Sequence, residues 1–92
     1  MEENDPISPM VMERLDYADD TLDADLNMHD RVAVMIGVCI EEGLTNASLI
    51  RLALKRRGYN VRHVSIMLQE GPGNVPDKLR WYQSPEGDFR LP

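Results

Sequence analysis

The chain has 92 residues, 42% of them hydrophobic, and a formal net charge of −6, which suits one small domain without an extended catalytic cleft, so we expect no enzyme. Its longest apolar run, Val32 to Ile40, is well short of the ~20 residues of a membrane span, so no membrane contact is expected. Cys39 is the single cysteine and the N-terminal start is acidic, unlike a secretory signal, which together predict a reduced, cytoplasmic setting.

The charge is divided unevenly along the chain. Residues 1–30 hold ten acids and one base, a local charge of −9, and residues 31–44 contribute −1. Residues 45–92 hold eight bases and four acids, a local charge of +4. The acidic average therefore conceals a basic C-terminal half, which is the part that favours contact with nucleic acid.

Residues 1–29 look like an acidic, largely flexible segment ahead of a domain at 30–92. Ser8 and Pro9 predict the start of a short helix with Val11, Leu15 and Ala18 on one face. Such a segment is mobile unless these side chains dock on the domain. The acidic residues allow three interpretations. The segment is a solubilising terminus, or residues 13–30 fold over the basic helix and wing and compete with nucleic acid. In the third, the segment mimics DNA and binds another protein.

A first domain helix is predicted from Asp30, as N-cap, to about Glu42, with Gly43 as its stop. Its two apolar stripes are Val32, Met35, Ile36, Cys39 and Ile40 on one side and Val34 and Val38 on the other. A buried strand is the alternative, because the run is rich in β-branched residues and contains Gly37. The second stripe needs a cover, either the helix expected near residues 9–18 or a second copy of the chain.

Two further helices are predicted at about 46–57 and 61–70, with a tight turn between them. Thr45 or Asn46 caps the first, Gly58 ends it, and Asn60 caps the second. Their inner faces comprise Leu49, Ile50, Ala53 and Leu54, and then Val61, Val64, Met67 and Leu68. This spacing is typical of a helix-turn-helix.

The segment Ser84-Pro85-Glu86-Gly87-Asp88 predicts a β-hairpin. Pro85 suits the first central position of a type I turn, and Gly87 suits a left-handed one. The three-residue loop pairs Ser84 with Asp88, Gln83 with Phe89, Tyr82 with Arg90, and Trp81 with Leu91. Alternation then places Leu79, Trp81, Phe89 and Leu91 on the buried face, with Gln83 as its one polar member. It places Arg80, Tyr82, Ser84, Asp88 and Arg90 on the exposed face.

The order of elements predicts a mostly α winged helix-turn-helix, three helices followed by a two-stranded wing. We expect a small DNA-binding regulator whose third helix enters the major groove, led by Arg62 and His63, and which dimerises to read two half-sites. The candidate DNA-binding residues are Arg51, Lys55, Arg62, His63, Ser65, Gln69, Arg80, Tyr82 and Arg90. A protein-interaction module, such as an inhibitor or assembly adaptor, is the alternative, because Ile66 and Glu70 share the outward arc of the third helix.

Short motifs resemble the N-terminal winged-helix DNA-binding domain of bacterial arginine repressors. They are Arg57-Gly58-Tyr59-Asn60-Val61, Val64-Ser65, Gln69-Glu70 and the closing Phe89-Arg90-Leu91-Pro92. The family's Thr-Gln-Ala-Thr recognition segment is replaced by Arg62-His63, and its C-terminal arginine-binding, hexamer-forming domain has no counterpart here. The resemblance therefore implies a winged helix with Arg62, His63 and Ser65 nearest the bases, and it does not imply arginine sensing.

No cofactor or metal site is predicted from the spacing of candidate ligands. Asp23 and Asp25 open like a calcium loop, but Met28 stands where that loop requires glycine and Val34 where it requires glutamate. The cysteine and the two histidines lack the spacing of zinc ligands, and the cysteine falls on an apolar helix face. Glycine-rich phosphate loops and serine nucleophile elbows are absent from the sequence.

Overall fold

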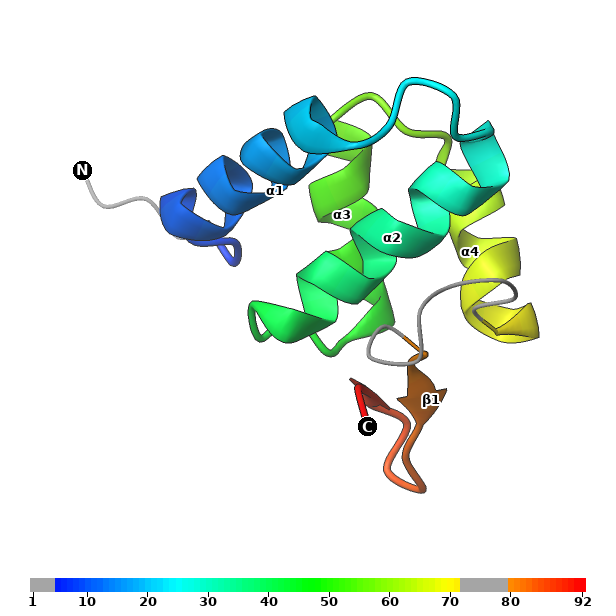
Figure 1. Ribbon diagram of the computed structural model, residues 1–92. Coiled ribbons are helices and arrows are strands. Elements are labelled where there is room, and N and C mark those ends of the chain that lie inside the picture. The colour runs from blue at the N-terminus through cyan, green and yellow to red at the C-terminus, as the bar shows by residue number, and fades with distance from the viewer. Residues whose placement is uncertain (1–4, 72–79) are drawn as a thin grey trace.

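A computed structural model describes residues 5–71 and 80–92, which form four helices and a two-stranded antiparallel hairpin (Figure 1). The elements are α1 (Pro9–Thr21), α2 (Met28–Glu41), α3 (Ala47–Arg56), α4 (Val61–Glu70), β1 (Tyr82–Gln83) and β2 (Phe89–Arg90). Helix α2 crosses the middle of the molecule and contacts α1, α3, α4 and β2. The predicted class, mostly α with a small hairpin, is confirmed.

The central position of α2 follows from its sequence, which is apolar around the whole circumference. Its buried residues are Val32, Ala33, Met35, Ile36, Gly37, Val38, Cys39 and Ile40. The strand alternative for this run is excluded. The expected cap was wrong: Asn27, and not Asp30, is the N-cap, because the Asn27 side chain accepts a hydrogen bond of 2.8 Å from the Asp30 backbone N–H and starts the helix at Met28.

Helix α1 packs against α2. It begins as its sequence predicts, with Ser8 as N-cap accepting from the Met10 N–H and Pro9 in the first turn. Its apolar face is buried, and Leu15 and the preceding Ile7 have no exposed surface. Of the two covers considered for α2, a folded-back N-terminal helix is the one observed.

Helices α3 and α4 pack against each other, and six of the eight residues predicted on their inner faces are buried, while Leu49 and Val61 are half-buried. Asn46 and Asn60 are their N-caps, each accepting hydrogen bonds from backbone N–H groups of the following turn. Gly58, in the turn between them, has φ of +91°, a left-handed conformation that side chains with a Cβ rarely adopt. The short turn therefore depends on glycine at this position.

The hairpin has the predicted register. Tyr82 pairs with Arg90 and Gln83 with Phe89, and Gly87 is left-handed at φ of +97°. The N–H of Phe89 also donates to the Thr45 carbonyl at 2.8 Å, which ties the hairpin to the α2–α3 connection. Trp81 and Phe89 are buried as expected, while Leu91 is half-buried.

Two residues of the hairpin, Gln83 and Ser84, differ from the prediction, and Leu79 lies outside the described residues. Gln83 is predicted on the buried face but is exposed, because its side-chain amide donates to the Gly87 carbonyl at 3.1 Å in the turn. Ser84 was placed on the exposed face but is buried, and its Oγ has no hydrogen-bond partner within the described part of the chain. The strand ends at Gln83, so the alternation of faces does not extend to Ser84, which belongs to the turn.

Candidate nucleic-acid interface

Helix α3 presents two of the predicted DNA contacts along one face. Arg51 is half-buried and Lys55 is exposed, one helical turn further along. The Arg51 guanidinium donates to the Ser48 hydroxyl at 3.4 Å, in the first turn of the same helix. Lys55 is thus fully accessible to a ligand, and Arg51 is accessible in part.

Helix α4 presents a mixed surface. Arg62 and Gln69 are exposed, whereas His63 and Ser65 are half-buried. Ile66 is 43% exposed and Glu70 is exposed on the same helix. The outer arc of α4 therefore carries one cation, one amide, one large apolar side chain and one carboxylate.

The predicted wing residues lie apart from the first turn of α4. Figure 1 shows the hairpin at the end of the bundle where α2 finishes and α3 begins, away from the start of α4. Arg80 and Tyr82 are exposed, and the Arg90 guanidinium lies 3.6 Å from the Asp88 carboxylate. The predicted residues thus form two groups, one on α3 and α4 and one on the hairpin.

An open depression of about 500 Å³ lies where the hairpin meets α2. It is lined by Ile40, Glu41, Thr45, Tyr82, Arg90 and Leu91. Two of these, Tyr82 and Arg90, are predicted DNA contacts, but Glu41 adds a carboxylate to the same depression. The wing surface is therefore not uniformly basic.

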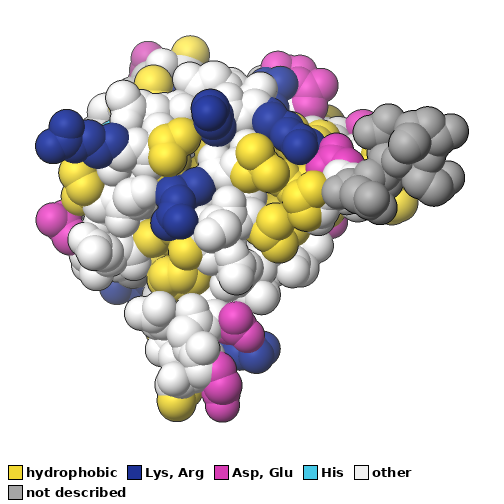
Figure 2. Space-filling view, turned by 180° about the vertical axis from the view of Figure 1, so that it is seen from behind, with side chains coloured by type: hydrophobic (Ala, Val, Ile, Leu, Met, Phe, Trp, Pro, Cys, Tyr) yellow, Lys and Arg dark blue, Asp and Glu magenta, His cyan; other side chains and the backbone are white. Residues whose placement is uncertain are grey.

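Figure 2 shows the face opposite to the view of Figure 1. Lys and Arg side chains are scattered over this face among hydrophobic side chains, while Asp and Glu side chains lie mainly toward its margins and on the projecting end at the bottom. The basic side chains of this face suit contact with a phosphate backbone, and the apolar area between them suits contact with a protein partner.

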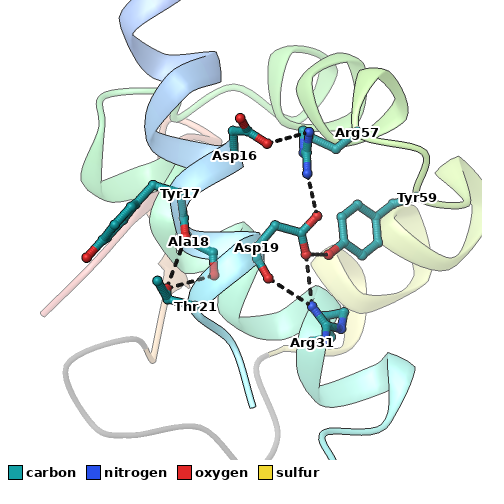
Figure 3. Close-up of polar contacts among 8 residues, drawn as sticks. All are labelled: Asp16, Tyr17, Ala18, Asp19, Thr21, Arg31, Arg57 and Tyr59. Atoms are coloured by element: carbon teal, nitrogen blue, oxygen red, sulfur yellow. Dashed lines mark hydrogen bonds and ion pairs between the residues drawn. The ribbon is translucent and has the colours of Figure 1, made fainter. Parts of the chain in front are cut away.

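A polar cluster that the sequence did not predict joins α1 to the turn between α3 and α4 (Figure 3). Asp19, near the end of α1, accepts 2.9 Å hydrogen bonds from the guanidinium groups of Arg31 and Arg57 and a 2.6 Å bond from the Tyr59 hydroxyl. Arg57 also pairs with Asp16 at 2.9 Å. One carboxylate thereby links three separate parts of the chain.

The environment of this cluster shifts the pKa values of its members. Burial alone would raise the pKa of Asp19, but hydrogen bonds from Tyr59, Arg57 and Arg31 outweigh burial and hold that pKa below its ordinary value. Burial first, and then the bond to Asp19, raise the pKa of Tyr59 to about 12. The cluster therefore keeps Asp19 ionised and Tyr59 protonated across the physiological range.

Two further ion pairs join the N-terminal region to the rest of the chain. Asp5 lies 3.0 Å from Arg56, and the Arg14 guanidinium lies 3.4 Å from the Glu42 carboxylate. The Arg56 guanidinium holds the pKa of Asp5 below its ordinary value.

The acidic segment thus meets the C-terminal end of α3 rather than its outward face. Within residues 5–71 and 80–92, no ion pair is recorded for Arg51, Lys55 or Arg62. The uneven charge of the sequence was a signal that the two halves attract each other. It did not identify Asp19 as the residue that receives the arginines.

Nothing outside the structure assigns a family. No protein-family model matches the chain, and comparisons with curated proteins and with solved structures find no match. Among the described residues, no group of three or more His, Cys, Asp or Glu side chains is arranged to hold a metal ion. No helix in the same part of the chain is long and apolar enough to cross a membrane.

Proposed function

We propose that this chain is a small, non-enzymatic DNA-binding regulator of the winged helix-turn-helix type that acts as a homodimer. The observation that carries the proposal is where the acidic α1 docks. Its carboxylates engage Arg31 and Arg57, with Asp5 on Arg56. Lys55 on α3 and Arg62 on α4 remain exposed to solvent, and Arg51 is half-buried. In an acidic protein, cations left uncompensated on one face favour a polyanionic ligand.

The arrangement of α3, the turn and α4 supports the mechanism. Arg62 lies in the first turn of α4, where a recognition helix contacts base edges, and Arg51 and Lys55 lie on the adjoining helix, where they reach phosphates. Arg90 on the hairpin would add a contact to the flanking backbone. A single copy offers few such contacts, so two copies on two half-sites are needed for firm binding.

Binding of the full-length chain to duplex DNA of mixed sequence, titrated against salt, tests this function. With roughly three to five phosphate contacts, log K should fall against log salt with a slope of about −3 to −5. Lys55→Gln should lower the magnitude of that slope by about 1. Arg14→Gln removes an arginine that pairs with Glu42 away from this face and is the matched control. Absence of binding at low salt would refute the proposal.

Ile66 favours a second candidate, a protein-interaction module. Ile66 is 43% exposed and lies between Arg62 and Glu70 on the outward arc of α4. Burial of an exposed isoleucine against an apolar partner surface contributes binding free energy, whereas contact with phosphates contributes little. Ile66→Ser distinguishes the two functions. It should leave the salt-dependent DNA affinity nearly unchanged if α4 reads DNA, and it should abolish complex formation if α4 binds a protein.

A further inference from the structure

The chain contains two histidines, and the fold brings them together. His29 lies in the first turn of α2 and His63 in the first turn of α4. Their ring centroids are 5.7 Å apart, with the ring planes tilted by 34°. His29 is exposed and His63 is half-buried, so at least one ring is directly accessible from solvent.

The ring nitrogens of this pair are not committed elsewhere. Within the described residues, the recorded hydrogen bond of His63 is made by its backbone N–H, which donates to Asn60, and none is recorded for either imidazole. Imidazole nitrogen is the protein ligand that Zn²⁺ and similar divalent transition-metal ions most often share. We propose that His29 and His63 form a two-histidine site for such an ion, which joins the first turn of α2 to that of α4.

The separation of the rings fits this coordination. With a Zn–N bond of about 2.0–2.1 Å, the ion lies roughly 3.2 Å from each ring centroid, and a tetrahedral angle then sets the centroids about 5.2 Å apart. The observed 5.7 Å differs from that value by about half an ångström. His29 is exposed, so a change in its side-chain torsions is the adjustment that the site would require.

The two histidines fill only two coordination positions of the ion, and water would occupy the others. No third His, Cys, Asp or Glu joins the pair among residues 5–71 and 80–92, and Cys39 is fully buried. The affinity rests on chelation by two rings that the fold holds in place, because capture of the first ring makes binding of the second intramolecular. The site does not depend on DNA binding, although it uses one of the residues predicted to approach the bases.

The test uses the full-length chain without an affinity tag, titrated with Zn²⁺ at neutral pH and followed by calorimetry and by NMR of the imidazole nitrogens. Zn²⁺ should shift the resonances of both rings and raise the melting temperature. Each of His29→Ala and His63→Ala should lose affinity by about a hundredfold, and the double variant should lose little more. Since binding requires neutral imidazoles, acidification should release the ion.

Two controls separate this site from general attraction to an acidic protein. Asp30→Asn removes a carboxylate next to His29 and should leave Zn²⁺ affinity unchanged, because Asp30 is not a ligand. Mg²⁺ should not reproduce the shifts, because it prefers oxygen ligands. Zn²⁺ binding that survives either histidine substitution, or that shifts neither ring, would overturn the proposal.

Discussion

Replacing Asp19 with asparagine should destabilise the whole domain, because this side chain connects α1, α2 and the turn after α3. The substitution keeps the shape of the side chain but removes the charge that two guanidinium groups and a tyrosine hydroxyl share. The Asp19 side chain is 16% exposed, and those of Arg31 and Arg57 are 22% and 26% exposed, so water replaces the lost contacts only in part.

The magnitude follows from these contacts. Hydrogen bonds to charged groups contribute about 1.5–3 kcal/mol each when buried, and asparagine retains some of them, so a net loss of about 2 kcal/mol in the free energy of unfolding is expected. For a domain of this size, that corresponds to a melting temperature lower by about 8–16 °C. Urea denaturation monitored by circular dichroism measures the loss.

The pH dependence provides a second readout. The folded pKa of Asp19 is lowered from its ordinary value of 3.8. The contribution of Asp19 to stability is therefore complete above that ordinary pKa, and it is lost as the pH falls through the lower pKa of the folded state. The difference in stability between the wild type and Asp19→Asn should therefore shrink in acid. Asp25→Asn removes the same charge from an exposed residue and is the matched control. Equal stability of the two variants would refute the reasoning.

Three further predictions concern the packing of the chain. Leu15→Ala, at a fully buried position of α1, should cost about 2–5 kcal/mol in urea denaturation, against less than about 0.5 kcal/mol for Met10→Ala, which is 76% exposed on the same helix. Gly58→Ala should cost about 1–3 kcal/mol in the same assay because alanine is strained at φ of +91°; a clash is not the cause, because an added Cβ would meet no atom within 4 Å. Gly58→Asn should cost less, because asparagine tolerates the left-handed conformation better than alanine. Burial raises the pKa of Cys39 to about 12, so a thiol reagent at mildly alkaline pH should modify it only after denaturant is added.

Each of these predictions has a result that contradicts it. Equal losses for Leu15→Ala and Met10→Ala would mean that α1 is not packed on α2 in solution. An unchanged or raised stability for Gly58→Ala would mean that the turn relaxes out of the left-handed conformation. Modification of Cys39 in the folded protein, at the rate of an exposed cysteine, would mean that α2 opens readily.

Sequence predicted those parts of the fold that local chemistry determines. Asn60 marks the start of a helix because its side chain accepts a hydrogen bond from a backbone N–H of the first turn. Gly58 marks the end of one because a residue without a Cβ readily adopts a left-handed conformation. Pro85 and Gly87 determine the hairpin register through their backbone angles, the fixed φ of proline and the left-handed φ of glycine. Such signals act within a few residues, so they can be identified without knowledge of the rest of the molecule.

The contacts that were missed join distant parts of the chain. Asp19 receives Arg31 and Arg57, and the rings of His29 and His63 meet, only after α1, α2 and α4 have packed. Periodicity placed each helix but not its rotation or its distance from the others. The candidate site was therefore predicted as a set of residues, whereas the division into an α3–α4 surface and a separate hairpin surface required the structure.

The docking of α1 changes how a role for the acidic segment in DNA binding has to be tested. Deleting residues 1–29 would remove the negative charge together with Leu15 and the cover of α2, so altered DNA affinity would report on folding as much as on charge. Neutralising Asp16 is the cleaner experiment, because its side chain is 59% exposed and its recorded partner is Arg57 alone among the described residues. A gain in affinity at low salt that vanishes at high salt would show competition with nucleic acid. A loss of stability without that gain would identify α1 as a purely structural element.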